Sequence, residues 1–174
     1  MKITFIPLSK NHFPLLLKWL NTPHVKKFWD EDIVWTLAKI SEKYESYTRG
    51  YKREDGYKKT IKAYIILSND DPVGYIQIYN AYDFRRSKPL HNLPEKLAAI
   101  DILIGEEKYL NQGIGSMSIE TFLDGDIGDY SHVFVGPDMD NISAIKAYEK
   151  AGFIKIQENL EEREIWMLRE IKND

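Results

Sequence analysis

An almost unbroken apolar run at residues 97–104 constrains this chain more than any other feature. The run reads Leu-Ala-Ala-Ile-Asp-Ile-Leu-Ile, and a strand of this composition is typically covered on both of its faces. Its one charged residue, Asp101, is costly to bury unless the carboxylate faces a cleft or a partner. We therefore expect a central strand between two layers, with Asp101 either at an opening or in an ion pair with a lysine.

A glycine motif follows this strand. Gly113-Ile114-Gly115 stands where a polar loop leads into a predicted helix at 113–124, and the N–H groups and positive dipole at such a helix start bind anions. The motif is not a Walker loop, because no Lys-Ser or Lys-Thr follows, and Ser118 replaces the third glycine of a dinucleotide fingerprint. Taken alone, the glycine pair is equally typical of a tight turn.

The remaining pattern predicts a single domain over residues 1–174. Hydrophobic periodicity gives an element order of β-α-α-β-β-β-α-β-α-β-β, which indicates an α/β fold with one mixed sheet and helices on both faces. The expected strands are 2–7, 61–68, 73–82, 97–104, 131–135, 153–157 and 163–170. The expected helices are one capped by Ser9 and broken at Thr22-Pro23, then 33–48 with Val34, Leu37, Ile40 and Tyr44 on one face, 113–124 and 141–151.

Composition excludes several classes of function. The chain has no cysteine, which rules out disulfides, thiolate metal sites and a cysteine acyl-enzyme. Its four histidines lack the spacing of zinc ligands, so no metal is expected. A net charge of -3 argues against general nucleic-acid binding. No apolar run approaches the roughly 20 residues of a membrane helix, and a cytoplasmic protein without a membrane partner is expected. The sequence carries no signal for the oligomeric state.

A second segment, from Asn141 to Phe153, makes the glycine motif more informative. It reads Asn-Ile-Ser-Ala-Ile-Lys-Ala-Tyr-Glu-Lys-Ala-Gly-Phe, with Asn141 as a helix N-cap, Gly152 as a helix end, and Ile142, Ile145 and Tyr148 as a stripe facing the core. Preceded by a strand and a Gly-x-Gly helix, this segment resembles the GNAT superfamily of acetyl-CoA-dependent N-acetyltransferases. That resemblance implies a GNAT fold with a splayed central sheet.

The resemblance also implies where the two substrates bind. Acetyl-CoA would enter between the strands near 100–104 and 131–135, and an amine would attack its thioester directly. Pantetheine is expected along Ile102, Leu103 and Ile104, with an N–H near Leu103 at the oxyanion. The cofactor-binding set is completed by Asn111, Gln112, Gly113, Ile114, Gly115 and Ser116 at the pyrophosphate, together with Asn141.

Two residues are expected to carry the chemistry. An attacking amine must be held and must lose its proton, and a carboxylate at Asp101 serves both needs. By resemblance, Tyr148 protonates the departing CoA thiolate. The alternative for Tyr148 is a core aromatic residue whose hydroxyl is satisfied within the protein.

Further segments resemble one group of these enzymes, the aminoglycoside 6′-N-acetyltransferases. The matching stretches lie at 13–21, 24–29, 72–79 and 100–115, and the acceptor would be an aminoglycoside amine, as in antibiotic resistance. The chain departs from this group at three places. Gly136 stands where a second acid is usual, Leu110 replaces the usual Arg or Gln, and the loop 82–96 is basic where its counterparts are acidic and aromatic.

The acceptor therefore stays open among several classes. Besides an aminoglycoside, the acceptor alternatives are a siderophore-type hydroxylamine, another metabolite amine or a protein amine, and a CoA-binding sensor without catalysis is a non-enzymatic alternative. For a small-molecule amine, the expected contacts are Trp29, Tyr79, Tyr82, Asp83 and Asp138. Trp29, Trp35, Tyr79 and Tyr82 form either an aromatic wall for the acceptor or part of the core.

Overall fold

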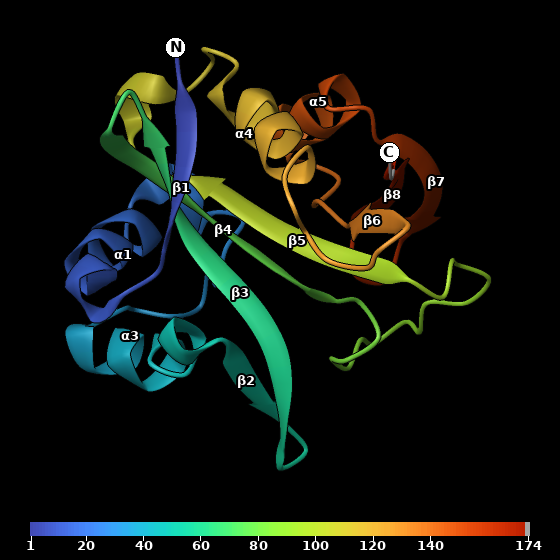
Figure 1. Cartoon of the computed structure of the whole chain (residues 1–174), viewed down its shortest axis with the longest axis horizontal. Coiled ribbons are helices and arrows are strands. Elements are labelled where there is room, and N and C mark those ends of the chain that lie inside the picture. Colours follow the sequence, from blue (N-terminus) through green and yellow to red (C-terminus); the bar gives the residue numbers. More distant parts are fainter. Residues whose placement is uncertain (173–174) are drawn as a thin grey trace.

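A computed structural model describes residues 1–172 and shows a single twisted sheet with helices on both of its faces (Figure 1). The strands are β1 (Ile3–Pro7), β2 (Tyr51–Glu54), β3 (Tyr57–Ser68), β4 (Asp71–Asn80), β5 (Leu97–Ile104), β6 (His132–Val135), β7 (Ile154–Asn159) and β8 (Glu164–Glu170). The α-helices are α1 (Phe13–Leu20), α2 (Pro23–Lys26), α3 (Leu37–Tyr44), α4 (Ile114–Leu123) and α5 (Ile142–Lys150). Short 3-10 turns lie at Lys10–His12, Tyr47–Arg49 and Glu107–Tyr109.

The strands follow the order β1-β3-β4-β5-β6-β8-β7 across the sheet, and β2 pairs with the first part of β3. Every neighbouring pair is antiparallel except β5 and β6, which run parallel. A parallel pair requires a crossover connection, and α4 provides it. The mixed sheet predicted from the sequence is therefore present, with its parallel pair at the centre.

Two layers of helices bury the two faces of this sheet (Figure 1). On one face, α1 and α3 pack around the fully buried side chains of Trp19 and Tyr44. On the other face, α4 and α5 contribute Ile119 and Tyr148 to a separate cluster. Because side chains alternate along a strand, Ile100 of β5 faces α4 and α5, whereas Leu103 faces α1 and α3. Asp101 shares the face of Leu103.

Most element positions agree with the sequence predictions, and the differences have local causes. The helix expected at 33–48 begins only at Leu37, because the Thr36 hydroxyl accepts a hydrogen bond from the Lys39 N–H at 3.3 Å and caps the helix there. Val34 and Leu37 were expected on its buried face but are 68% and 53% exposed. Ile142, expected in the core-facing stripe of α5, is 54% exposed.

A hairpin between β2 and β3 was not expected from the sequence. It turns at Asp55 and Gly56, whose φ angles of 50° and 81° are those of a two-residue type I′ turn. The exposed residues at the start of β3 lack the alternation that marks a half-buried strand, which is why the strand was predicted to begin at residue 61. α2 is a further addition, since Pro23 starts a short helix as well as ending the previous one.

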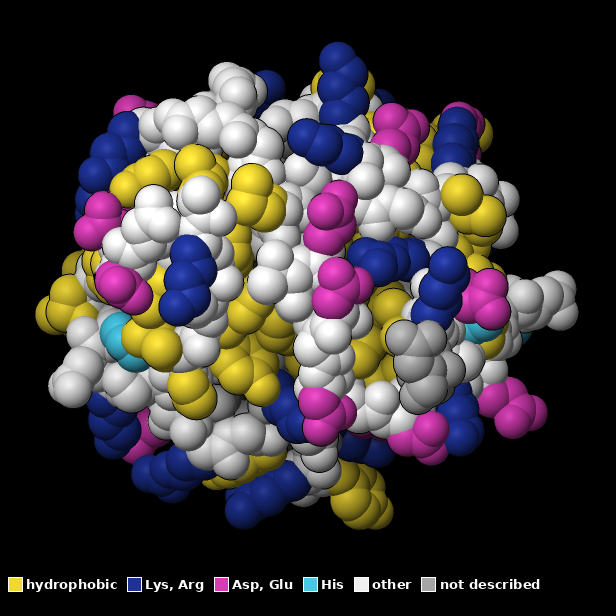
Figure 2. All heavy atoms as spheres, turned by 45° about the horizontal axis from the view of Figure 1, so that its top comes forward, with side chains coloured by type: hydrophobic (Ala, Val, Ile, Leu, Met, Phe, Trp, Pro, Cys, Tyr) yellow, Lys and Arg dark blue, Asp and Glu magenta, His cyan; other side chains and the backbone are white. Residues whose placement is uncertain are grey.

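The surface is of mixed charge. On the face shown in Figure 2, acidic and basic side chains are interspersed around apolar patches. Among residues 1–172, no helix combines the length and the apolar character needed to cross a membrane.

Candidate active site

The candidate site lies where β5 and β6 separate. Their parallel pairing joins Leu97–Ala99 to His132–Phe134 and then stops, whereas β5 continues to Ile104. β6 ends at Val135 and is followed by Gly136 and Pro137, and a proline cannot donate to a strand ladder. The edge of β5 that faces β6 is therefore left without a strand partner after Ala99.

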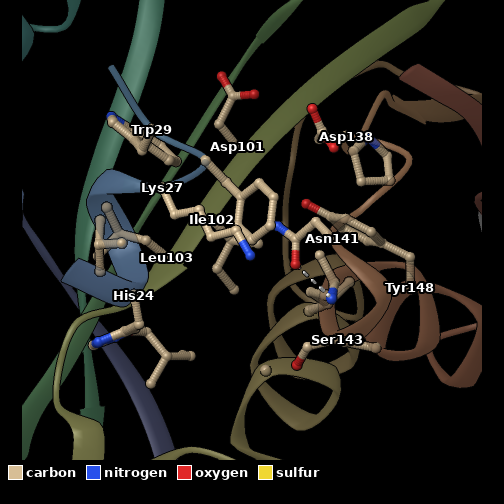
Figure 3. Close-up of a pocket in the computed structure, with 18 of the residues that line it drawn as sticks. His24, Lys27, Trp29, Asp101, Ile102, Leu103, Asp138, Asn141, Ser143 and Tyr148 are labelled. Carbon is tan, nitrogen blue, oxygen red and sulfur yellow. Dashed lines mark hydrogen bonds between the residues drawn. The ribbon is translucent and has the colours of Figure 1, made fainter. Parts of the chain in front are cut away.

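A cavity of about 420 Å³ fills this gap and extends between α2, β5, α4 and α5. The close-up in Figure 3 shows Asp101, Ile102 and Leu103 of β5 on one side and Asn141 and Tyr148 of α5 on the other. The structure thus brings together nine of the residues predicted for the site: Trp29, Asp101, Ile102, Leu103, Ile104, Gly115, Asp138, Asn141 and Tyr148. Asn111, Gln112, Gly113, Ile114 and Ser116 lie outside the cavity lining, as do Tyr79, Tyr82 and Asp83.

Asp101 is half-buried and belongs to a chain of hydrogen bonds that begins in the core. The hydroxyl of the fully buried Tyr75 donates to Oε1 of Gln77 at 2.6 Å, and Nε2 of Gln77 donates to Oδ2 of Asp101 at 2.7 Å. Among residues 1–172, Asp101 forms no salt bridge, so the ion pair with a lysine that the sequence left open is not seen. Asp101 instead lines the cavity, with its carboxylate turned toward Gln77 of β4.

Tyr79 of β4 is two residues from Gln77, so its side chain lies on the same face of the sheet as Gln77 and Asp101. Burial raises the pKa of Tyr79 well above its usual value, and the nearby negative charge of Asp101 raises that pKa further. Tyr79 is therefore a protonated donor at neutral pH. Tyr79 itself lies outside the cavity lining.

Tyr148 reaches the cavity from the opposite layer. Its ring packs edge-on against Phe153 with the ring centroids 5.4 Å apart, and its hydroxyl points into the cavity (Figure 3). Burial raises the pKa of Tyr148, and the charge of Asp101 raises it further. Tyr148 therefore keeps its proton throughout the neutral range, as a general acid requires.

The start of α4 offers backbone N–H groups to an anion. Gly113 occupies the N-cap with a φ of 77°, and Asn111 shortly before it has a φ of 58°, so the loop turns through left-handed conformations that expose the first helical N–H groups. Ile114 and Ser116 are buried, and the Ser116 hydroxyl donates to the Gly113 carbonyl at 3.0 Å. Only the backbone of these two residues is free to contact a ligand.

Two basic residues that were not predicted also belong to the site, one beside the start of α4 and one in the cavity. A Cβ on Gly113 would lie 3.6 Å from Nζ of Lys150, the last residue of α5, so a cation accompanies the turn. Lys27 lines the cavity itself, and Figure 3 shows its ammonium group directed inward. Neither lysine could be assigned to the site from the sequence. Lys150 is brought to Gly113 by the packing of α5 on α4, and Lys27 is brought to the cavity by the turn of the chain after α2.

His24 forms a hydrogen bond to the last residue of β5. Its Nε2 lies 2.8 Å from the Ile104 carbonyl oxygen, which makes that nitrogen the donor, and its Nδ1 lies 3.7 Å from Glu107. Among residues 1–172, no group of His, Asp or Glu side chains is suited to hold a metal ion.

The predicted acceptor residues do not all converge. Trp29 lines the cavity and packs edge-on against Tyr75 with centroids 6.1 Å apart. Tyr82 is directed elsewhere, because its hydroxyl donates to the Pro94 carbonyl at 2.7 Å, and Asp83 lies 3.7 Å from Lys59. Trp35, considered for an aromatic wall, is 4% exposed and belongs to the core.

Two of the four basic side chains of the loop 82–96 are paired with carboxylates. Arg85 forms a salt bridge of 3.1 Å with Asp55, and Lys96 one of 2.7 Å with Asp129. The guanidinium of Arg86 lies 4.8 Å from the ring centroid of Phe134, and Nζ of Lys88 lies 5.5 Å from that of Trp166. The loop therefore repels a cationic acceptor less than its composition predicts.

Comparison with known proteins identifies this arrangement. Residues 9–159 match the family model of the acetyltransferase (GNAT) domain. Aminoglycoside N(6′)-acetyltransferases type 1 of Klebsiella pneumoniae and of Serratia marcescens are each 25% identical to this chain over 154 residues, which cover 87% of it and 73% of each relative.

Solved structures agree at the level of the fold. The aminoglycoside acetyltransferase AAC(6′)-Ib in complex with coenzyme A and kanamycin superposes with a TM-score of 0.81 at 23% identity, covering 97% of this chain and 95% of that one. The aminoglycoside N(6′)-acetyltransferase of Legionella pneumophila gives a TM-score of 0.72 at 21% identity, covering 98% and 94%. The predicted GNAT fold is confirmed.

Proposed function

This chain belongs to the acetyltransferase (GNAT) domain family, and we propose that it transfers the acetyl group of acetyl-CoA to a primary amine of a small molecule, the 6′-amine of an aminoglycoside. The observation that carries this proposal is the placement of Asp101 and Tyr148 in one cavity, from opposite layers of the fold. A base and an acid on either side of a transferring group are what direct attack of an amine on a thioester needs.

The donor side of the site suits acetyl-CoA. The unpaired edge of β5 at residues 102–104 can pair with the amides of pantetheine, and the N–H groups at the start of α4 can hold the pyrophosphate. Lys150 adds a cation beside Gly113. Asn141 lines the cavity as the N-cap of α5. Its side-chain oxygen accepts a hydrogen bond from the Ala144 N–H at 3.2 Å, which fixes the side chain at the edge of the donor site (Figure 3).

The acceptor side suits an ammonium group. Oδ2 of Asp101 already accepts from Gln77 at 2.7 Å, which leaves Oδ1 to bind the amine and, directly or through a water molecule, to take its proton. Trp29 offers an apolar wall for the carbon skeleton next to it.

The chemical step follows from these positions. The amine nitrogen forms a bond to the thioester carbon, and the proton it loses passes to Asp101. A backbone N–H near Leu103 stabilises the negative oxygen that develops. The carbon–sulfur bond then breaks, and Tyr148 gives its proton to the CoA sulfur, so that the products are an N-acetyl amine and CoA. Both substrates are present at once in this scheme, because the chain has no cysteine to carry the acetyl group.

The relatives favour an aminoglycoside as the acceptor. The two relatives from Klebsiella pneumoniae and Serratia marcescens, each covered over 73% of its length, are named aminoglycoside N(6′)-acetyltransferases. The acetyltransferase solved in complex with coenzyme A and kanamycin has the same fold as this chain. The loop 82–96 is compatible with such a cationic acceptor, because Arg85 and Lys96 are paired with carboxylates. We place the reaction in the cytoplasm, the compartment that supplies acetyl-CoA.

Release of CoA thiol from acetyl-CoA tests this proposal with two acceptors that differ at one group. One is a kanamycin-type aminoglycoside with a 6′-amine, and the other is its analogue with a 6′-hydroxyl. Release with the amine alone is the expected result. Binding of acetyl-CoA without release for either acceptor, or for a panel of metabolite amines and hydroxylamines, would instead indicate a CoA-binding sensor.

A further inference from the structure

The carboxylate of Glu164 lies next to Gly136, the residue that follows β6. Gly136 is on the other side of the opening from Asp101. Glu164 is the first residue of β8, and a Cβ on Gly136 would lie 3.4 Å from its Oε2. That same oxygen accepts a hydrogen bond from Nε1 of Trp166 at 3.0 Å. Trp166 is buried, so the carboxylate is held in a fixed place beside a residue that has no side chain.

The register of the sheet puts this carboxylate across the opening from Asp101. Ala99 of β5 pairs with Phe134 of β6, the last pair before the strands separate, so Asp101 and Gly136, each two residues further along, lie on the two sides of the opening. Ala99, Phe134 and Trp166 share one buried cluster. Because side chains alternate along strands, Asp101 and Glu164 lie on the same face as that cluster.

Glu164 has the properties of a binding residue rather than of a structural ion pair. It is only half-buried, and within residues 1–172 it forms no salt bridge. One oxygen is fixed by Trp166 and the other remains an acceptor. Two cations of the loop 82–96, Arg86 and Lys88, lie over the rings of Phe134 and Trp166. Gly136 itself lines the cavity, as does Asp138, which forms an isolated β-bridge to Glu164.

We propose that Glu164 binds a second ammonium group of the acceptor, while Asp101 binds the reacting one. The proposal rests on the proposed acetylation of a multi-amine acceptor. It assigns to this chain a preference for acceptors with at least two amines, set by two carboxylates on opposite sides of the opening. A side chain longer than a methyl group at position 136 would occupy the space beside the Glu164 carboxylate.

The substitution Glu164→Gln tests this inference, because it keeps the shape and an oxygen for Trp166 but removes the charge. We compare kcat/KM for kanamycin A, which has several amines, with that for 6-amino-6-deoxyglucose, which has one. The kanamycin preference is expected to fall at least fivefold, through KM, since hydrogen bonds to charged groups are worth more than neutral ones. Glu162→Gln removes one charge from the exposed turn before β8 and is the matched control.

A relocation variant guards against a purely structural effect. Glu164→Ala combined with Gly136→Asp moves the carboxylate to the other strand and frees the space that the new side chain needs. It is expected to regain most of the kanamycin preference that Glu164→Ala alone loses. An unchanged preference in Glu164→Gln, or no recovery in the double variant, would overturn the role of Glu164.

Calorimetry of kanamycin binding in the presence of CoA separates this inference from the proposed function. If the wild-type chain binds kanamycin without acetylating it, and Glu164→Gln binds it at least fivefold more weakly, the acetylation proposal fails and the role of Glu164 stands. If the wild-type chain neither binds nor acetylates kanamycin, both fail.

Discussion

Gln77 and Asp101 lie opposite one another on β4 and β5 and are joined by a hydrogen bond of 2.7 Å from Nε2 to Oδ2. Asp101 fixes the orientation of this amide, because a carboxylate can only accept and so takes the NH₂ group, which leaves Oε1 to accept from the Tyr75 hydroxyl at 2.6 Å. The proposed base is therefore connected through two side chains to the aromatic core formed with Tyr44 and Trp29. Its position is set by the core as much as by its own strand.

Replacing Gln77 by leucine should lower the turnover number about tenfold, which corresponds to about 1.4 kcal/mol of lost orientation of Asp101. KM for acetyl-CoA should stay within about twofold, because Gln77 lies on the acceptor side. Steady-state kinetics with kanamycin as acceptor would measure both values, and Gln157→Leu on the exposed strand β7 is the control. A loss confined to KM for acetyl-CoA would contradict this role.

Removing the hydroxyl of Tyr148 should slow the reaction about 100-fold, the usual scale for loss of a general acid. Because burial raises the pKa of Tyr148, the wild-type turnover number should not fall on the alkaline side until above about pH 10 from titration of this group. The comparison is Tyr148→Phe against Tyr64→Phe, a half-buried tyrosine on the same face of the sheet. Full activity in Tyr148→Phe would exclude the assignment.

The strand with its single carboxylate, the glycine turn and the capped helix α5 were all predictable, because each is marked within a few neighbouring residues. Gln77 was overlooked, although it is a polar residue within an apolar strand, the same signal that singled out Asp101. The Asp55–Gly56 turn was also readable from its dipeptide. Both features are therefore marked by local signals in the sequence.

Other features depend on pairing between distant segments and could not be read from one stretch. The contact of Glu164 with Gly136 arises from the pairing of β6 with β8, and that of Lys150 with Gly113 from the packing of α5 on α4. Tyr82 and Asp83 were predicted near the acceptor, but contacts with Pro94 and Lys59 direct them elsewhere.

Two glycines with similar backbone angles allow a test of the proposed pyrophosphate site. Gly113 has a φ of 77° and Gly56 a φ of 81°, so alanine at either position should cost a similar strain of about 1 kcal/mol. Only Gly113→Ala should also raise KM for acetyl-CoA, by about fivefold or more, since it alters the start of α4. Thermal unfolding and kinetics of both variants would show this, and an equal effect on KM would argue against the site.

Buried tyrosines should make the protein sensitive to alkali. Burial raises the pKa values of Tyr44, Tyr75, Tyr79 and Tyr148 above the usual 10.0. Above about pH 10 the unfolded chain releases these protons while the folded chain retains them, so the free energy of unfolding falls as pH rises, by about 1.4 kcal/mol per pH unit for each group. The melting temperature should therefore drop steeply between pH 10 and 11.5 and change little between pH 8 and 9.

The variant Tyr75→Phe offers the matching control for this pH dependence. It removes one titrating group, so its melting temperature should fall less steeply above pH 10 than that of the wild-type chain. A melting temperature that stays constant up to pH 11.5 in the wild-type chain would contradict the burial of these hydroxyls.

The most direct test of the account is the rate of CoA thiol release by Asp101→Asn with kanamycin, measured beside the affinity for acetyl-CoA. Asparagine keeps the shape of the side chain and can still accept from Gln77, but it cannot take a proton from the amine. We predict a turnover number at least 100-fold below that of the wild-type chain with an acetyl-CoA affinity within about twofold. Turnover equal to that of the wild-type chain would show that the acceptor amine is deprotonated elsewhere and would refute the proposed site.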